Sequence, residues 1–553
     1  MKSRIGLALL TLLVAAPAAQ AAISDPVKTN AGQVSGVSLP SGVRVFKGIP
    51  FGAPPVGDLR WREPQPVAKW NGVKKMDTWG APCMQNPSPN RKPPNNATDQ
   101  PDSPKPSEDC LYLNLWTKAN RSGDKLPVMV WLFGGAYTEG GGNSIHSDGE
   151  NLAKKGVVLI TMNYRLGKLG FFSHPELTKE SPHNASGNQA LADVIAVLQW
   201  VKANAASFGG DPNNVTVFGE SAGSCMVAML AGSPVAKGLF HRGIAESGGW
   251  GGLSVAAMTP RATAEAQALA PPGRGGRGGR GGPGAGGPGG PAGGRGVGGP
   301  PQAGAAAAPG AGAPPAAAPP AAAPPAAPAE PAAPFVPPTL AQLRALPADH
   351  ALRVTGGGQP VIDGWIIPED QNITFEKGKQ NPIDVIAGFN KDEHTAFGGV
   401  NSTNTGMRDG IAYHARLFAE KQTAIGKKAF WYELTQEPPY EPGVQSLRAT
   451  HATDIAYVFN NLDKPHMYPD QSSPKLASES EVDRKWADTI SSYWVNFART
   501  GDPNGPGLPK WEQFKDRNAP PMYLGEKKEG PSAETLNALD ANYKRILDQV
   551  LPK

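Results

Sequence analysis

The sequence contains no hydrophobic run long enough to cross a membrane. The stretch that comes nearest opens the chain, in MKSRIGLALLTLLVAAPAAQAA, and falls short of the ~20 apolar residues that a spanning helix needs. Lys2 and Arg4 precede this run, and the small residues Ala-Gln-Ala at 19–21 follow it, a pattern typical of a secretory signal peptide. We therefore predict a signal peptide over residues 1–21 and a mature protein that is soluble and either secreted or periplasmic.

Cysteine is equally scarce, because Cys83, Cys110 and Cys225 are the only three among 553 residues. Three cysteines allow one intramolecular disulfide at most. In an exported protein Cys83 and Cys110 could form that bridge, which would leave Cys225 outside it.

Net charge is small once two segments are set aside. The formal net charge is +5, of which the predicted signal peptide contributes two positive charges and the segment 271–338 a net three. The RGGRGGR stretch in that segment is similar to RNA-binding tracts, but such tracts rely on aromatic stacking, and Phe335 is the only aromatic residue there. Since the remaining chain is close to neutral, we expect no nucleic-acid partner.

Residues 271–338 consist almost entirely of glycine, proline and alanine. Such a composition offers too little apolar area to offset the entropy cost of ordering the backbone, so we predict that this insert is disordered. The stretches on either side, 259–270 and 339–354, show small and apolar residues at helical spacing. The chain would then comprise a signal peptide and one domain, residues 22–553, that the insert interrupts.

The domain is predicted to be of the α/β class. Short apolar runs rich in β-branched residues, typical of buried strands, occur at 126–133, 156–164, 214–218, 242–247 and 383–390. Stretches with helical spacing separate several of them, notably 188–208 and 221–232. This alternation predicts a mostly parallel sheet with helices on both faces.

Ser221 lies between two glycines in VTVFGESAGSCM, residues 215–226. The pattern G-x-S-x-G alone is weak, because a chain with 68 glycines can match it by chance in an ordinary turn. Here, however, a predicted strand precedes the serine and a predicted helix follows it. That context is the nucleophile elbow, in which a tight turn lifts the serine oxygen above the carboxyl edge of the sheet. Ser221 is therefore predicted to be a nucleophile.

A serine nucleophile needs a base and an orienting acid, which follow it in the order acid, then histidine, in α/β-hydrolases. Among the six histidines after Ser221, position favours His451, which lies between a strand-like run and a helical stretch. Asp392 and Glu393 both follow the predicted strand 383–390, and spacing does not choose between them.

Donors for a reacting oxyanion are expected next to the first strand. Gly134, Gly135 and Ala136 follow that strand, and such small residues let backbone N–H groups approach a substrate oxygen. The N–H of Ala222, directly after the serine, would complete the set. The alternative is a flexible glycine loop.

At this point the motifs resemble those of a known family. FGGDPNNVTVFGESAG (208–223) is similar to the active-serine signature of the type-B carboxylesterases, which include cholinesterases and bacterial p-nitrobenzyl esterases, and SEDCLYLNLW (107–116) is similar to their second signature. The resemblance runs from about Val34 to Leu524 and skips only the insert. Further matching stretches occur in the same order at 48–66, 163–172, 238–249 and 493–505.

The resemblance implies an α/β-hydrolase fold and a Ser-Glu-His triad of Ser221, Glu393 and His451, with Glu393 rather than Asp392 as the acid. It also implies two-step hydrolysis of a small-molecule ester, without a cofactor or a metal ion.

The family pattern also suggests roles around the triad. The oxyanion donors fall on Gly135, Ala136 and Ala222. Glu220 and Ser247 match positions that support the triad in relatives.

The family disulfide maps onto Cys83 and Cys110. The chain departs from the family pattern at three positions: His394 and Ala136 stand where glycine is usual, and Glu246 stands where glutamine is common. None of these changes removes a catalytic group.

Two other functions remain open at this stage. The same triad could act on amides, carbamates or lactones, or the chain could be a non-catalytic binding member of the fold. The natural substrate and the oligomeric state are not predicted. We hypothesise that the insert 271–338 is dispensable for catalysis and tethers the protein to the envelope or to another protein.

Overall fold

The structure is a computed structural model that describes residues 25–85, 100, 102–248, 258–271, 335–399, 401–438, 446–464, 480–525 and 531–550. The predicted signal peptide and most of the predicted insert (272–334) lie outside the described residues.

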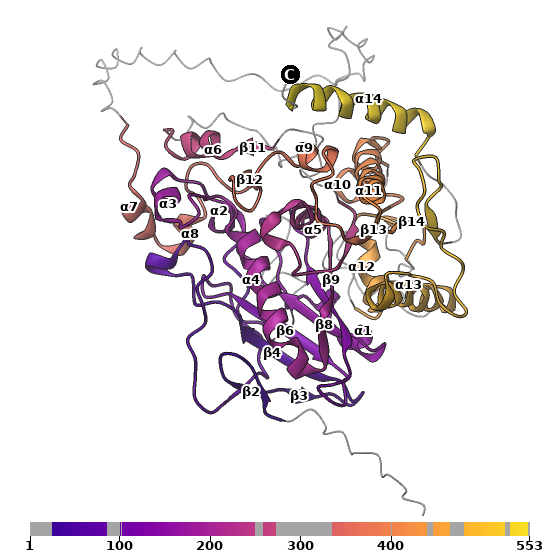
Figure 1. The fold of residues 1–553 in the computed structure, drawn as a ribbon, viewed down its shortest axis with the longest axis horizontal. Helices are drawn as coiled ribbons and strands as arrows, with labels where there is room; N and C mark the ends of the chain where they lie inside the picture. Colours follow the sequence, from indigo (N-terminus) through magenta and orange to yellow (C-terminus); the bar gives the residue numbers. More distant parts are fainter. Residues whose placement is uncertain are drawn as a thin grey trace, which may run out of the picture.

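A ten-stranded sheet forms the centre of the molecule (Figure 1). The seven strands from β15 to β8 are mutually parallel, and the last three are antiparallel. The strands in spatial order are β15 (Met522–Leu524), β14 (Ala429–Leu434), β13 (Asp384–Asn390), β10 (Arg242–Glu246), β9 (Gly210–Glu220), β7 (Leu126–Leu132), β8 (Val158–Met162), β6 (Tyr112–Thr117), β4 (Arg44–Pro50) and β3 (Val37–Ser38). Two small sheets hold β1 (Val27–Lys28), β2 (Gln33–Ser35) and β5 (Val73–Lys75), and β11 (Thr259–Pro260) with β12 (Val361–Ile362).

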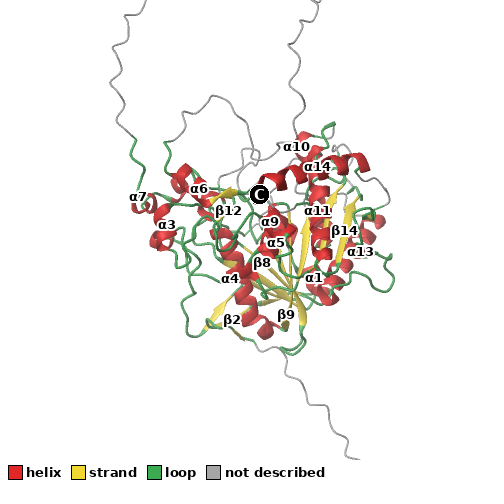
Figure 2. Cartoon of the chain, turned by 45° about the horizontal axis from the view of Figure 1, so that its top comes forward, coloured by secondary structure: helices red, strands yellow, loops and turns green. Residues whose placement is uncertain are grey.

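Helices surround this sheet (Figure 2). Helices α4 and α5 pack on β9, α11 packs on β13 and β14, and α13 packs on β7 and β9. The helices are α1 (Glu150–Lys154), α2 (Gly167–Gly170), α3 (Pro175–Glu180), α4 (Gln189–Asn204), α5 (Ala222–Gly232), α6 (Arg261–Ala268), α7 (Leu340–Arg344), α8 (Ala348–Ala351), α9 (Gln371–Glu376), α10 (Thr395–Gly398), α11 (Gly406–Ala424), α12 (Thr453–Val458), α13 (Glu481–Thr500) and α14 (Ala533–Val550). No helix in the described part of the chain is long and apolar enough to span a bilayer.

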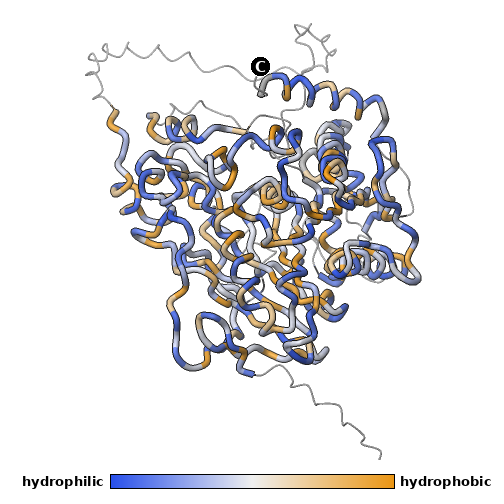
Figure 3. Tube along the Cα trace, in the orientation of Figure 1, coloured by the Kyte–Doolittle hydropathy of each residue, from blue (hydrophilic) through white to orange (hydrophobic). Residues whose placement is uncertain are grey.

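The central strands are buried on both faces, which explains their continuous apolar sequence. Successive side chains of a strand point to opposite faces, and Val128, Met129, Val130 and Trp131 of β7 are all almost completely buried. Hydrophobic positions run through the interior, whereas hydrophilic and hydrophobic positions are mixed along α14 at the rim (Figure 3). The predicted parallel sheet covered by helices on both faces is therefore confirmed.

Some element boundaries differ from the prediction. Strand β9 begins at Gly210 rather than at residue 214, because its polar start still pairs with β7. The predicted helix 339–354 forms two short helices, α7 and α8, separated around Pro347. Proline lacks the N–H that a continuous helix requires, and it disfavours helical backbone at the preceding residue.

The two ends of the insert are held at one place. Ala268 of α6 and Leu340 of α7 belong to the same small apolar cluster, which also contains Trp61 and Phe172. The chain therefore leaves the fold and returns to it through one anchored region.

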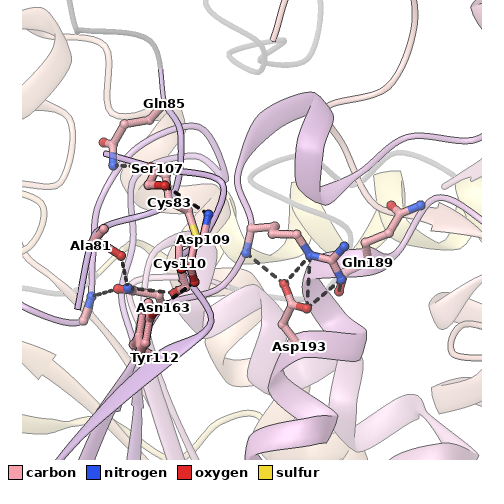
Figure 4. The surroundings of a disulfide bond; sticks show 12 residues. Ala81, Cys83, Gln85, Ser107, Asp109, Cys110, Tyr112, Asn163, Gln189 and Asp193 are labelled. Atoms are coloured by element: carbon pink, nitrogen blue, oxygen red, sulfur yellow. Dashed lines mark hydrogen bonds and ion pairs between the residues drawn. A yellow bond between two sulfur atoms is a disulfide. The ribbon is translucent and has the colours of Figure 1, made fainter. Parts of the chain in front are cut away.

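The structure also contains the disulfide between Cys83 and Cys110 (Figure 4). The side-chain amide of Asn163 donates to the carbonyl of Cys110 at 3.0 Å and to that of Ala81 at 2.9 Å, which fixes the bridge to the end of β8. Cys225 lies buried in α5 outside this bridge.

Candidate active site

Ser221 occupies the sharp turn between β9 and α5, as the sequence predicts. Its φ of 54° and ψ of −118° lie outside the regions that non-glycine residues usually adopt. The flanking glycines make this turn possible. A Cβ atom on Gly219 would lie 2.6 Å from the carbonyl oxygen of Leu132, and one on Gly223 would overlap the same carbonyl group. The serine is thus held in a strained position that close packing against β7 imposes.

Backbone hydrogen bonds fix this turn to the neighbouring strand and to its own helix. The N–H of Ser221 donates to the carbonyl of Glu246 at 2.9 Å, and its carbonyl accepts from the N–H of Cys225 at 3.0 Å. Ser221 is 9% exposed as a whole residue. Ala222, the predicted third oxyanion donor, is the first residue of α5, so its N–H belongs to the helix N-terminus, where negative charge is favoured.

His451 and Glu393 are in direct contact. The imidazole Nδ1 lies 2.5 Å from Oε2 of Glu393, and both side chains are buried. The other carboxylate oxygen of Glu393 accepts the N–H of Asn390 at 2.8 Å. The carboxylate of Asp392 lies instead near a lysine: its Oδ2 is 3.9 Å from Nζ of Lys391. The structure therefore brings Glu393, and not Asp392, to the histidine.

The loops that carry the acid and the histidine are joined by hydrogen bonds. The N–H of Asp392 donates to the carbonyl of Ala449 at 2.9 Å, and the side chain of Asn390 donates to the carbonyl of Thr450 at 2.8 Å. Thr395 Oγ1 donates to Thr450 Oγ1 at 2.9 Å. Because the backbone of Asp392 pairs with the opposite loop, the next residue is the one directed at the imidazole.

The second imidazole nitrogen, Nε2, lies 3.1 Å from Oε1 of Glu220, the residue that precedes Ser221. Burial alone would lower the pKa of His451, but the carboxylates of Glu220 and Glu393 outweigh that effect and raise it to about 9. Burial raises the pKa of Glu220 to about 8, although a positive charge on His451 acts in the opposite direction. This arrangement strongly favours an imidazolium ion between two carboxyl groups.

The loop after β7 approaches the serine closely. A Cβ atom on Gly134 would lie 2.9 Å from Cβ of Ser221 and would also overlap the carboxylate of Glu220. Gly135 and Ala136 both have positive φ, 109° and 51°. Such a backbone favours glycine at Gly135, whereas Ala136 adopts it as a strained residue. The predicted oxyanion loop is therefore next to the serine and tightly constrained.

Ser247, predicted to support the triad, contacts Asp454, a residue that the sequence analysis did not identify. The Ser247 hydroxyl donates to Oδ2 of Asp454 at 3.3 Å, and the Tyr432 hydroxyl donates to the same oxygen at 3.0 Å. Asn390 donates to Oδ1 at 3.2 Å. Burial and Glu393 raise the pKa of Asp454 to about 6. Its place close after His451 in the sequence, at the start of α12, was the available sequence signal.

His394, the departure next to the acid, has an ordinary right-handed backbone with φ of −70° and ψ of −20°. Any residue adopts this conformation, so the position does not require glycine. Within the described ranges, no group of three or more His, Cys, Asp and Glu side chains is placed to hold a metal ion.

Comparisons with known proteins identify the family of this chain. A family model described as the carboxylesterase family matches residues 24–272 and 410–543. Ser221 and His451 lie within the matched ranges and Glu393 lies between them.

Individual relatives match over most of the chain. The fumonisin B1 esterase of Sphingopyxis macrogoltabida is 31% identical over 526 residues, which cover 88% of this chain and 84% of that protein. The para-nitrobenzyl esterase of Bacillus subtilis (strain 168) is 29% identical over 539 residues, covering 90% and 94%. A solved carboxylesterase of Geobacillus stearothermophilus is 26% identical with a TM-score of 0.65, covering 93% of this chain and 99% of that one. The fold is thus the α/β-hydrolase fold that the sequence predicts.

Proposed function

This chain belongs to the carboxylesterase family, and on that premise we propose that it cleaves carboxylic esters through an acyl-enzyme formed on Ser221. The observation that carries the proposal is the 2.5 Å contact between His451 and Glu393. The other imidazole nitrogen lies 3.1 Å from Glu220, the residue directly before the serine. Ser221, His451 and Glu393, all three buried, would supply the nucleophile, the base and the acid.

In the first step His451 accepts the proton of Ser221 through Nε2 as the serine oxygen attacks the ester carbonyl. Glu393 holds the imidazole through Nδ1 and stabilises the positive charge that forms on it. The developing oxyanion receives hydrogen bonds from the N–H groups of Gly135, Ala136 and Ala222. The leaving alcohol then departs with the proton from His451.

In the second step a water molecule takes the place of the alcohol. His451 accepts a proton from this water, which attacks the acyl group on Ser221, and the carboxylic acid product is released when the serine recovers its proton. Both steps pass through an imidazolium ion. The carboxyl groups of Glu393 and Glu220 favour that charged form, so they stabilise the transition state, in which the imidazole gains its positive charge.

The substrate class follows from what the reported relatives have in common. Their names include a fumonisin B1 esterase and a para-nitrobenzyl esterase, and both names specify cleavage of an ester. The proposal therefore specifies the bond that is cleaved and leaves the acyl and alcohol groups to a substrate panel.

A matched substrate pair tests the proposal. The purified protein should hydrolyse p-nitrophenyl acetate and leave p-nitroacetanilide, its amide counterpart, nearly untouched. Ser221→Ala should abolish the ester activity, whereas Ser233→Ala, at the other end of α5, should retain it. Faster cleavage of the anilide than of the ester would contradict the assignment of the substrate class.

We also propose that the protein is exported. The N-terminal pattern of residues 1–21 supports export, and so does the Cys83–Cys110 disulfide, because such bonds persist in oxidising compartments. Detection of the mature N-terminus after residue 21 in periplasmic or culture fractions tests this proposal. An uncleaved chain found only inside the cell would contradict it.

A further inference from the structure

Glu246 occupies a defined place beneath the predicted triad. The sheet register sets it opposite Glu220 of β9 on one side and Gly388 of β13 on the other, and Gly388 is opposite Tyr432 of β14. Side chains at matched positions of neighbouring strands lie on the same face of a sheet. A Cβ atom at Gly388 would overlap the ring of Tyr432, so this ring occupies the space that a side chain at position 388 would need.

Two carboxyl groups share this buried region, and their hydrogen bonds differ. Glu246 is completely buried, and its Oε1 accepts from the indole N–H of Trp494 at 2.7 Å, while its Oε2 accepts nothing from the described residues. Asp454 accepts three hydrogen bonds, from Ser247, Asn390 and Tyr432. The other titratable groups next to Glu246 are Glu220 and Tyr432, and no lysine or arginine forms an ion pair with it within the described ranges. Glu393 and His451 interact with Glu220 and Asp454 instead.

This difference determines where a negative charge can reside. A buried carboxylate is stable only when hydrogen-bond donors or a cation replace the water that it loses. Two neighbouring carboxyl groups without a cation between them cannot both ionise. Asp454 is therefore the group that ionises, because three hydrogen-bond donors stabilise its carboxylate. Glu246 is the group that keeps its proton, because its Oε2 accepts no hydrogen bond from the described residues.

We propose that Glu246 is a positioning residue that stays protonated, so that Asp454 alone carries the negative charge of this buried pair. Burial and the neighbouring Asp454 raise the pKa of Glu246 well above its usual range, in agreement with this assignment. The proposal also explains the departure from the family pattern, because a protonated glutamate is, like glutamine, neutral and able both to donate and to accept.

The proton has a consequence for the triad. Asp454 accepts from Asn390, and the N–H of Asn390 donates to Glu393. An additional charge on Glu246 would repel Asp454 and disturb the group that orients the acid. With Glu246 neutral, the pair carries a single negative charge below His451.

Infrared difference spectroscopy of the full chain without substrate tests the protonation directly. At neutral pH, wild type minus Glu246→Gln should show the C=O stretching band of a protonated carboxylic acid. Glu108→Gln is the matched control, because Glu108 forms two hydrogen bonds with the guanidinium of Arg60. Its difference spectrum should show carboxylate bands only. Carboxylate bands alone for Glu246 would overturn the proposal.

A second variant covers the case in which Glu246→Gln does not fold. Trp494→Phe removes the donor to Oε1 of Glu246, so the acid C=O band should move to higher wavenumber. A spectrum without any change in the acid region would overturn the proposal.

Stability gives an independent readout. A carboxyl group with a raised native pKa contributes stability that is complete below its unfolded pKa of about 4.3 and is lost as pH rises toward the native value. Glu246→Gln should therefore gain Tm relative to wild type as pH increases from about 5 to about 8. A gain that shrinks with rising pH would show that Glu246 is ionised in the native protein.

Kinetics test the positioning role, and this part alone rests on the proposed esterase function. In Glu246→Gln a neutral amide replaces a neutral acid. The acid limb of kcat/KM, which is the rise of kcat/KM with pH on the low-pH side of its profile, should therefore have the same midpoint as in wild type, and the rate should change by less than about threefold. A shift of this limb by a full pH unit toward acid would show that Glu246 carries a charge near His451, and would overturn the proposal.

Discussion

The Nε2 atom of His451 lies 3.1 Å from Oε1 of Glu220, the residue that directly precedes Ser221. The imidazole is thus held between two carboxyl groups, because its Nδ1 contacts Glu393 on the other side. A base placed in this way becomes protonated easily and keeps its charge in a site that excludes water. That property would assist a reaction that passes through an imidazolium ion. It also means that His451 becomes the neutral base only at higher pH.

Glu220→Gln should therefore shift the acid limb of kcat/KM toward lower pH. Neutral His451 is the active base, and the Glu220 carboxylate raises the pKa of His451, so its removal lets the imidazole lose its proton at lower pH. The plateau should fall about tenfold, because the imidazolium ion is then less stable. Rate profiles on a p-nitrophenyl ester measure both effects. A limb that stays in place or moves toward higher pH would refute the coupling between the two groups.

Glu393→Gln should reduce kcat by about 10⁴, because the amide no longer stabilises the required tautomer of His451 or the imidazolium ion. Asp392→Asn is the matched control, since its side chain lies beside Lys391 and not at the imidazole. We expect this variant to retain activity within about threefold. Circular dichroism spectra should show that both variants are folded. The opposite ranking of the two variants would assign the acid to Asp392.

Gly134→Ala should lower kcat/KM by about a hundredfold or more, because the added methyl group would meet Ser221 and Glu220 and displace the oxyanion loop. Gly410→Ala is the matched control. Gly410 lies in α11 with open space around it, so this change should leave activity intact and stabilise the helix by about 0.5–1 kcal/mol. Steady-state kinetics and thermal melts distinguish the two. Equal activity of both variants would show that the loop does not act in catalysis.

Replacing the insert, residues 271–338, by a short Gly/Ser linker should leave kcat/KM on small esters within about threefold. The ends of this segment are anchored, because Ala268 and Leu340 lie in one apolar cluster. Loop-closure entropy depends only logarithmically on length, so the fold should tolerate the shorter connection. A loss of about a hundredfold with an unchanged fold would indicate that the segment contributes to the active-site entrance.

Local sequence patterns were sufficient for part of this site. Ser221 could be placed because the strand, the two glycines and the helix that define its turn are contiguous in the chain. The central strands could be placed for a similar reason, since burial on both faces gives a continuous apolar run.

Side-chain directions within the loops were not predictable in the same way. The choice between Asp392 and Glu393 depends on hydrogen bonds to a loop almost 60 residues further along, which spacing does not encode. The resemblance to the family selected Glu393, and the contact with His451 agrees with it. Asp454 was missed because its partners are far apart in the sequence: Ser247 directly follows β10 and Tyr432 lies on β14, and they come together only in the folded sheet.

The central claim, an acyl-enzyme on Ser221, is tested most directly by trapping that intermediate. The enzyme should be quenched in acid during turnover of a p-nitrophenyl ester and digested, and the peptides weighed by mass spectrometry. We predict that the acyl group is found on the peptide that contains Ser221, at this residue, and that it is absent from Ser221→Ala. An acyl group on a different residue, or full turnover by Ser221→Ala, would contradict the claim.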